Sequence, residues 1–351
     1  MDTNVGFVMD KQPVTTVLMP VFNGSQYLRD AMASILSQTF TRFEFLIIDD
    51  GSSDDSVTII KSFSDPRIRL VMNGTNLGLI ETLNKGLLLA RGRYVARMDC
   101  DDISHSERLA LQVSYMDKHD NVAVCGCWIK AFGSQRFVNR YPLTDDLIRA
   151  QLLFENALAH PSVMMRRDVF LAERLFYDAG TMRAEDYDLW TRVPTSFKLA
   201  NLNRILLYYR QHQQQVSAAF LSEQSDITRT IRRKQLEGLG MELTSETLDL
   251  HVKISQKKPE ISTAFLGNAA TWLLALQEKN SQTNIYDGMA LAEIVKRYWW
   301  ETCFHATELG FGAWKSYFSS LISRQARIGT VCQTLFLLKC LLRKHSNSQA
   351  T

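Results

Sequence analysis

The sequence contains no uncharged apolar run close to the ~20 residues that a helix needs to span a bilayer. The longest candidate runs from Ile328 to Leu342, and Gln333 and Lys339 interrupt it. We therefore expect this stretch to lie at an interface instead of crossing a membrane. The N-terminus has early acidic residues and no long apolar stretch behind a basic start, so we expect no signal peptide and a cytoplasmic chain.

Proline and glycine are also few, with 7 and 17 among 351 residues, and no tract of biased composition indicates disorder. The six cysteines are scattered, and Cys125 and Cys127 lie in an apolar run that is typical of a buried strand. We expect reduced thiols in the core, not disulfides or a zinc site.

The excess of positive charge is small. A net charge of +3 does not by itself imply a nucleic-acid partner, and we expect none. The charge is unevenly placed, because the chain from residue 315 to its end has basic residues and no Asp or Glu. Such an end can bind anionic lipid head groups at the inner face of the cell membrane, or it can be a solvated basic terminus. Its basic residues are Lys315, Arg324, Arg327, Lys339, Arg343 and Lys344.

Short β-rich runs alternate with helical patterns over the first hundred residues. This alternation predicts an α/β fold with a mainly parallel, doubly wound sheet that is flanked by helices and binds ligands at the carboxyl ends of its strands. The predicted strands are Val14–Met19, Phe43–Ile48, Arg67–Met72 and Tyr94–Met98, and the predicted helices reach to about Ser37, to about Phe63 and from Ile80 to Ala90.

The alternation fades after the fourth strand, and from about Ser222 the pattern is helical. We place a domain boundary near residue 220, with the α/β domain over 1–220 and a helical C-terminal region over 221–351. In between we predict helices at Arg108–Lys118, Asp145–Phe154 and Glu185–Val193, strands at Ser162–Arg166, Phe197–Leu199 and Ile205–Tyr209, and a strand pair within Val122–Val138.

Three carboxylates lie within four residues directly after the fourth strand. Asp99, Asp101 and Asp102 repel one another unless a cation or several hydrogen-bond donors compensate for their charge. Oxygen ligands suit Mg²⁺ or Mn²⁺, which proteins commonly hold with one or two carboxylates plus substrate phosphates. The alternative is that Asp102 caps the next helix, but a cap needs one carboxylate and leaves the other two unexplained.

A second acidic pair, Asp49 and Asp50, ends the second strand in the same layer. Gly51 supplies a turn, after which Ser52 or Ser53 can cap the next helix. Acidic residues at such a strand end can accept hydrogen bonds from a base or a ribose. Taken alone, however, this pattern favours an ordinary turn.

Five segments together resemble family 2 glycosyltransferases of the GT-A fold, in order and spacing across roughly the first 110 residues. They are residues 17–24 (VLMPVFNG), 34–40 (SILSQTF), 47–54 (IIDDGSSD), 76–78 (NLG) and 98–102 (MDCDD). Cys100 stands where a small residue such as Ala is usual, and Phe22 replaces the more frequent Tyr. The resemblance implies an inverting enzyme that moves a hexose or N-acetylhexosamine from a nucleotide-diphosphate donor, with UDP as the default, to a glycan or lipid-linked acceptor in capsule, O-antigen or related polysaccharide biosynthesis.

The resemblance also implies residue roles. Residues 14–103 would bind the nucleotide sugar, and residues 104–220 would bind the acceptor and supply the base. Asp99 and Asp101 would form the Asp-x-Asp element for Mn²⁺ or Mg²⁺, with Asp101 as the direct ligand and Asp99 acting through water or the nucleotide. Asp50 would contact the base in a pocket that is lined by Pro20, Val21, Phe22, Asn23, Asp49, Asp50 and Asn76.

Residues 184–190 (AEDYDLW) resemble the family's Glu-Asp element, which supplies the catalytic base. An acceptor hydroxyl must lose its proton as it attacks the anomeric carbon, and a carboxylate within hydrogen-bond reach can take that proton. We assign this role to Asp186, with Glu185 as the second candidate. The alternative is an acidic first turn that the helix dipole favours.

Residues 208–212 (YYRQH) resemble a segment that closes over the diphosphate. There Arg210 would neutralise phosphate charge, and His212 would contact phosphate or metal. His160 could approach the donor sugar or the acceptor. Each of these histidines could equally be structural or simply exposed.

Two other classes of protein stay open at this point. One is a nucleotide-sugar-binding subunit without catalysis, but both acidic clusters and the Glu-Asp pair are complete. The other is a nucleotidyltransferase, which usually has a Gly-rich, basic phosphate loop near its N-terminus. Residues 20–24 (PVFNG) are neither Gly-rich nor basic.

Overall fold

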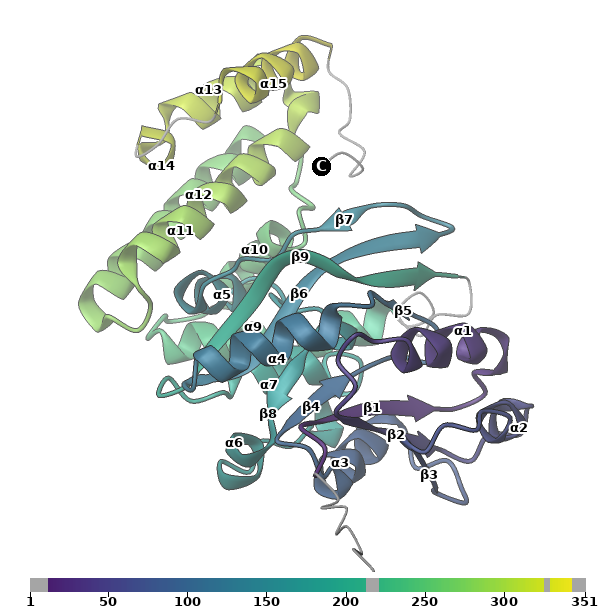
Figure 1. Ribbon diagram of the computed structural model, residues 1–351. Coiled ribbons are helices and arrows are strands. Elements are labelled where there is room, and N and C mark those ends of the chain that lie inside the picture. Colours follow the sequence, from purple (N-terminus) through teal and green to yellow (C-terminus); the bar gives the residue numbers. More distant parts are fainter. Residues whose placement is uncertain (1–11, 213–220, 325–328, 343–351) are drawn as a thin grey trace, which may run out of the picture. The chain divides into compact units, whose positions relative to one another are not determined.

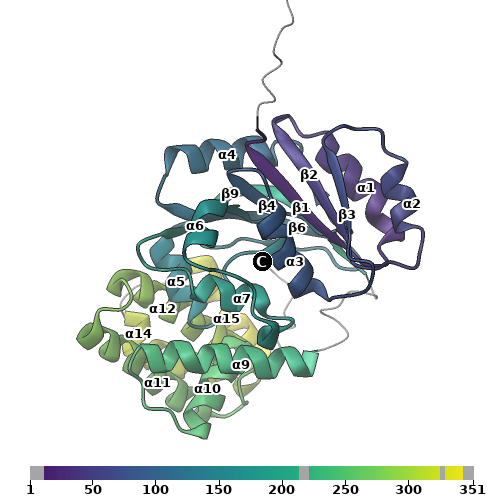
Figure 2. The same cartoon turned by 90° about the horizontal axis from the view of Figure 1, so that it is seen from below.

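Four parallel strands, three of them completely buried, build the first part of the chain, as the sequence predicts. They are β1 (Thr15–Val21), β2 (Phe43–Asp49), β3 (Ile68–Met72) and β4 (Tyr94–Arg97). Every residue of β1, β2 and β4 is buried. Such continuous burial requires cover on both faces of the sheet, and Figures 1 and 2 show α1 (Ser25–Leu36) on one face and α3 (Leu79–Leu89) on the other.

The computed structural model describes residues 12–212, 221–324 and 329–342, and its chain divides into two compact units. Unit 1 comprises Met1–Arg140, Leu158–Ala179 and Val193–His212. Unit 2 comprises Tyr141–Ala157, Gly180–Arg192 and Gln213–Thr351. The chain therefore passes repeatedly from one unit to the other.

The described residues of unit 1 form a nine-stranded sheet in the order β3-β2-β1-β4-β8-β6-β9-β5, with β7 paired to β6. The pairs among β1 to β4 are parallel, while β8 runs antiparallel to β4 and β6. The later strands are β5 (Ile103–Ser104), β6 (Val122–Gly133), β7 (Val138–Asn139), β8 (Met164–Arg166) and β9 (Lys198–Gln211). Because β9 pairs with β5, the end of β9 returns to the residues that follow β4.

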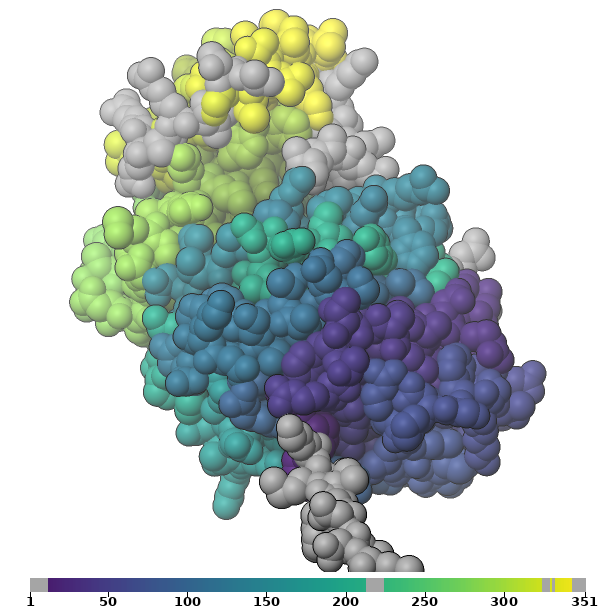
Figure 3. Space-filling view, viewed as in Figure 1, coloured from purple at the N-terminus to yellow at the C-terminus, as the bar shows by residue number. Residues whose placement is uncertain are grey.

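Apart from α4 (Arg108–Lys118), the remaining helical elements of unit 1 are short. In the space-filling view the first part of the chain, purple to blue, forms one continuous surface (Figure 3). The short elements are α2 (Ser56–Lys61), η1 (His160–Ser162), α6 (Arg167–Ala172) and η2 (Ala179–Thr181), the last of which ends in unit 2. Helix α1 packs against α2.

Three local predictions were wrong. The two strands predicted at 197–199 and 205–209 are one strand, β9, in which the pairing with β6 skips from Leu202 to Ile205 at an irregularity. Ser162 belongs to a 3-10 turn and not to a strand. Neither Ser52 nor Ser53 caps the second helix, because α2 begins at Ser56 after Asp55.

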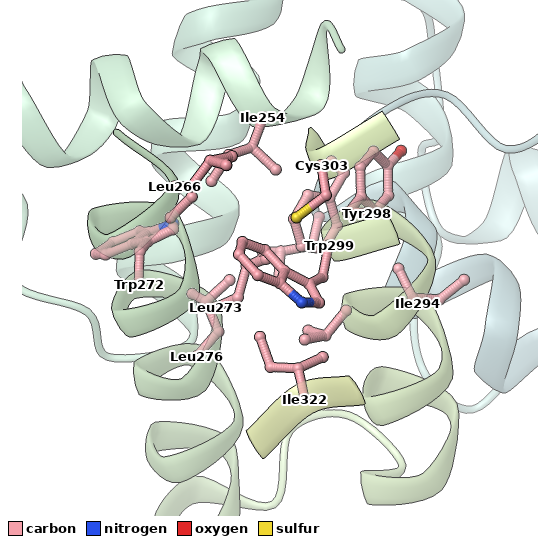
Figure 4. Packing of buried hydrophobic residues seen from close by; sticks show 14 of the residues in the cluster. Ile254, Leu266, Trp272, Leu273, Leu276, Ile294, Tyr298, Trp299, Cys303 and Ile322 are labelled. Carbon is pink, nitrogen blue, oxygen red and sulfur yellow. The ribbon is translucent and has the colours of Figure 1, made fainter. Parts of the chain in front are cut away.

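Unit 2 is helical. Its elements are α5 (Asp145–Leu152), α7 (Glu185–Thr191), α9 (Leu221–Gly238), α10 (Ser245–Ser255), α11 (Thr263–Thr283), α12 (Gly288–His305), η3 (Thr307–Leu309), α13 (Phe311–Ser319), α14 (Leu321–Arg324) and α15 (Thr330–Leu342). Figure 4 shows its core, where Leu273 of α11 and Trp299 of α12 lie among other buried side chains. Trp299 also donates a hydrogen bond from Nε1 to Ser323 Oγ.

His251 and Trp272 are two polar side chains inside this core that pair with each other. His251 lies fully buried, with Nε2 3.0 Å from the carbonyl oxygen of Leu153, while Trp272 Nε1 donates to His251 Nδ1 over 3.2 Å. Burial lowers the pKa of His251 to about 3, so the ring is neutral at physiological pH.

Two sequence-based expectations concern membranes and thiols. Among the described residues, no helix has both the length and the apolar character that a membrane span requires. All six cysteines are free thiols, and Cys125 and Cys127 are buried in β6, as expected. The expected core position is wrong for Cys332, which is exposed, and Cys100 is only partly buried. Much of the basic C-terminal end, including Arg327, Arg343 and Lys344, lies outside the described residues.

Candidate functional site

The acidic cluster at the end of β4 is the most concentrated charge in unit 1. Ligand oxygens of Asp99, Asp101 and Asp102 all lie within 4.8 Å of one another. Asp99 and Asp101 are partly exposed, whereas Asp102 is fully buried. The two partly exposed carboxylates, Asp99 and Asp101, can therefore present oxygen atoms to a cation.

Asp102 does not cap a helix, which corrects the alternative drawn from the sequence. Strand β5 follows it directly, and α4 begins only at Arg108. Its Oδ1 accepts a hydrogen bond from the backbone N–H of Arg210 at 2.8 Å, and its Oδ2 is buried with no hydrogen-bond partner among the described residues. Burial, followed by the nearby Asp99 and Asp101, raises the pKa of Asp102 well above its usual value.

Arg97, the last residue of β4, balances part of this charge. Its side chain is almost completely buried, and its Nη1 contacts Asp99 Oδ2 at 2.5 Å. Burial alone would lower the pKa of Arg97, but the Asp99 carboxylate holds it above the usual value. The sequence analysis missed this residue, although a lone Arg in a buried strand was a visible signal.

The end of β9 brings Arg210 and His212 to the same cluster. Arg210 Nε donates to the carbonyl oxygen of Asp101 at 2.8 Å, and His212 Nε2 lies 3.0 Å from Asp101 Oδ2. The Arg210 guanidinium also stacks over the ring of Tyr27, 4.3 Å from its centroid. Tyr27, on α1, is a second residue that the sequence analysis did not single out.

These side chains form a ligand set that suits a hard divalent cation. Carboxylate oxygens are ligands for Mn²⁺ or Mg²⁺, and Mn²⁺, the softer of the two, also accepts an imidazole nitrogen. The partnerless Oδ2 of buried Asp102 and the crowding of three carboxylates both fit a positive charge at this place. Asp101 and His212 are the side chains that would hold the ion.

The loops after β1 and β2 are joined by hydrogen bonds. Asn23 Oδ1 accepts from the backbone N–H of Ser53 at 2.9 Å, and the N–H of Asn23 donates to Ser52 Oγ at 3.0 Å. Asp54 accepts from the N–H groups of Ser25 and Ser56. Burial raises the pKa of Asp54, but hydrogen bonds from the side chains and the N–H groups of Ser56 and Ser25 outweigh it and lower the value to about 2. The contact between Asp54 and Ser25 was not predicted, since Ser25 is 29 residues away in the sequence.

Asp50 organises the neighbouring loop over residues 73–78. Its Oδ1 accepts from Asn73 Nδ2 at 2.7 Å and from the N–H of Leu77 at 2.9 Å, and its Oδ2 accepts from the N–H of Gly78 at 2.9 Å. Asp49, also buried, accepts from the N–H of Ser52. Direct contact between Asp50 and a nucleobase stays a prediction.

The predicted pocket-lining residues differ in exposure. Val21 is buried with the rest of β1, whereas the ring of Phe22 is 48% exposed and available for stacking. Asn76 is exposed, and its Oδ1 accepts from the N–H of Gly78. Pro20, Val21, Phe22, Asn23, Asp49, Asp50 and Asn76 thus all belong to the ends of β1 and β2 or to the 73–78 loop that Asp50 organises.

The variant Gly51→Ala tests how closely the turn after β2 approaches the loop over residues 73–78. Gly51 has φ +78°, and a Cβ on it would come within 2.7 Å of the carbonyl carbon of Thr75. Because that neighbour is backbone, we expect a stability loss of roughly 3 kcal/mol from strain and overlap and weaker nucleotide binding. Gly74→Ala is the control, since Gly74 has φ +79° with nothing within 4 Å of its Cβ position. Equal falls in Tm for the two variants would contradict the prediction.

The Glu-Asp element lies in unit 2, at the start of α7. Glu185 is buried, while Asp186 is partly exposed. Asp186 Oδ2 accepts a hydrogen bond from Asn156 Nδ2 at 2.6 Å, and Oδ1 lies 2.7 Å from the N–H of Tyr187. These contacts orient the Asp186 carboxylate, and its exposure makes it the more accessible of the two candidates for the base.

His160 has a structural environment. It is buried, and its Nε2 lies 2.9 Å from the hydroxyl of Tyr177. Burial and, to a smaller extent, the charge of Arg97 lower its pKa well below the usual value. This environment favours the structural interpretation of His160.

Comparison with known proteins relates these features to a family. A family model described as glycosyl transferase family 2 matches residues 16–175. An uncharacterized glycosyltransferase of Haemophilus influenzae is 31% identical over 241 residues, which cover 65% of this chain and 75% of the relative. The Escherichia coli protein WfgD, named as a UDP-Glc:alpha-D-GlcNAc-diphosphoundecaprenol beta-1,3-glucosyltransferase, is 27% identical over 58% of this chain and 80% of its own.

Solved structures show the same fold. The crystal structure of S. aureus TarS residues 1–349 in complex with UDP-GlcNAc superposes with a TM-score of 0.57. The alignment covers 86% of this chain and 88% of TarS at 18% sequence identity. A likeness at this identity establishes the architecture.

Proposed function

This chain belongs to glycosyl transferase family 2 and has the GT-A fold, and from that membership we propose that it is an inverting enzyme that uses a UDP-sugar. In this proposal a sugar passes to a hydroxyl group of a glycan or of a lipid-linked saccharide. The observation that carries the proposal is the convergence of Arg210 and His212 on Asp101. Membership in this family disfavours the nucleotidyltransferase alternative.

The donor assignment is supported by three features. Phe22 offers an exposed ring, and the loops after β1 and β2 are held together by hydrogen bonds. WfgD is named for a UDP-Glc donor, and TarS was crystallised with UDP-GlcNAc. We therefore propose UDP as the nucleotide, with a hexose or an N-acetylhexosamine as the sugar.

The proposed chemistry is a single displacement at the anomeric carbon. A divalent cation, Mn²⁺ or Mg²⁺, when bound by Asp101 with His212, would stabilise charge on the leaving nucleoside diphosphate. Arg210 places a guanidinium beside Asp101, where it can neutralise phosphate charge. Asp99, held by Arg97, would act through water or the nucleotide.

The proposed base is Asp186, with Glu185 as the second candidate. As the acceptor oxygen attacks, Asp186 would accept its proton, while Asn156 keeps the carboxylate oriented. One displacement inverts the configuration, so an α-linked donor yields a β-linked product. WfgD is named for a beta-1,3-linkage to a diphosphoundecaprenol-linked sugar, which supports a lipid-linked acceptor and a position on the inner face of the cell membrane.

Turnover of a nucleotide-sugar panel tests this proposal. The protein is incubated with Mn²⁺, with UDP- or GDP-sugars and with acceptor extracts, and the released nucleotide is measured. We expect release from one UDP-sugar, dependent on both the metal and the acceptor. Release only from a GDP-sugar would overturn the donor assignment, and an α-linked product from an α-linked donor would overturn inversion.

A further inference from the structure

Helix α15 of unit 2 is apolar on two opposite faces. Its inner face places Phe336 and Cys340 in the core of the unit. Its outer face carries four leucines, Leu335, Leu338, Leu341 and Leu342, whose side chains are 52%, 49%, 67% and 62% exposed. At 100° per residue these leucines lie within an arc of about 120°. A helix of a protein surrounded only by water would carry polar residues there.

Helix α13, which packs on α15, repeats this pattern. Trp314 and Tyr317 of α13 contact the ring of Phe336, with centroids 5.6 and 5.9 Å away. On its outer side, Phe311 and Phe318 are 65% and 36% exposed, and they are seven positions apart, so they lie on one helix face. Two adjacent helices thus expose large apolar side chains.

The charged residues of the chain after Glu308 are all basic. After Glu308 the sequence has no Asp or Glu. Lys315, exposed on α13, lies one helix turn from both Phe311 and Phe318. Lys339 lies between the leucines of α15 in sequence, and its Nζ is 4.3 Å from the ring centroid of Phe304. Exposed apolar rows bordered by lysines are typical of helices that lie in the headgroup region of an anionic bilayer.

We propose that the outer faces of α13 and α15, defined by Phe311, Lys315, Phe318, Leu335, Leu338, Lys339, Leu341 and Leu342, form a docking surface for an anionic lipid bilayer. The 13 residues of α15 extend about 20 Å, which is shorter than the ~30 Å hydrocarbon core, so the helix lies on the membrane and does not cross it. The surface deepens the proposed function, because it would bring the enzyme to a lipid-linked acceptor.

A second copy of the chain is the less suitable occupant. The four leucines and two phenylalanines of this surface present about 600 Å² of apolar area, counting about 100 Å² for each. A stable protein interface buries about 800 Å² on each partner. A symmetric interface would also bring two basic surfaces together, since neither copy has an Asp or Glu after Glu308, and like charges repel.

Vesicle co-sedimentation of the full chain tests the proposal. The probes are vesicles of phosphatidylcholine alone and of phosphatidylcholine with phosphatidylglycerol. We expect the wild-type chain to sediment with the anionic vesicles and salt to weaken this binding. In the triple variant Leu335→Gln, Leu338→Gln and Leu341→Gln, we expect the vesicle affinity to fall at least tenfold. The control is the double variant Leu88→Gln and Met289→Gln, which removes exposed apolar side chains elsewhere.

Two results would overturn the proposal. One is equal binding of the triple variant and the wild type to anionic vesicles. The other is a wild-type dimer that the triple variant dissociates without any change in vesicle binding, as measured by sedimentation velocity. Nucleotide release with a water-soluble acceptor should be unchanged in the triple variant, so a failure of docking is distinguishable from a failure of the proposed function.

Discussion

Replacing Asp101 with Asn lowers the rate of sugar transfer by about a thousandfold, as expected for a group that acts on charge in the transition state. Asp101 is partly exposed, and its Oδ2 already lies 3.0 Å from His212 Nε2. Asp102 is fully buried and bound to the N–H of Arg210, and Asp99 is paired with Arg97. Asp101 is therefore the carboxylate best placed to meet a cation.

The measurement combines turnover with calorimetry. Released nucleotide gives the rate, and titration with Mn²⁺ and the donor gives the affinities. Asp120→Asn is the matched control, because Asp120 is an exposed aspartate outside the cluster. If Asp101→Asn retained the wild-type affinity for Mn²⁺ and the wild-type turnover, the proposed ligand role of Asp101 would be wrong.

Replacing Asp186 with Asn has a different expected signature. Loss of a general base costs about 10²- to 10⁴-fold in rate, whereas donor binding is expected to stay at its wild-type value. Asn at this position keeps the size of the side chain and can still bond to Asn156 through its amide oxygen. A loss of rate at constant donor affinity then reports on proton transfer and not on folding.

Variants of neighbouring carboxylates make this test specific. Asp146→Asn, at an exposed position in the first turn of α5, should leave transfer unchanged. Glu185→Gln should lower the rate less than Asp186→Asn does. If Glu185→Gln lowered the rate more than Asp186→Asn, the base would be Glu185. Normal turnover in both variants would show that the Glu-Asp element does not supply the base.

The strands and acidic clusters of unit 1 could be predicted because their signals are local. Each of the first strands is a short apolar run ended by a turn residue, and such runs form a parallel sheet wherever helical patterns separate them. The extent of β9 was harder to predict from the sequence, because Asn203 and Arg204 fall at the irregular pairing with β6. They interrupt the apolar pattern without ending the strand.

Contacts across long sequence distances could not be predicted. Residue Arg97 is recognisable as the partner of Asp99 only when its burial is known. The bonds of Asp54 and Asp50 to distant N–H groups depend on how the loops meet. Likewise, the sequence indicates that Ile328–Leu342 lies at an interface, but which of its residues face outward is known only from the packing of α13 against the inner face of α15.

The interleaved path of the chain affects the order in which the protein can form during synthesis. Unit 2 takes in Tyr141–Ala157 and Gly180–Arg192 before its main segment begins at Gln213. The ring of Phe154 stacks on that of Tyr298, with centroids 4.1 Å apart. Phe154 is therefore synthesised long before Tyr298. The first segments of unit 2 cannot complete their packing until nearly three hundred residues have been translated.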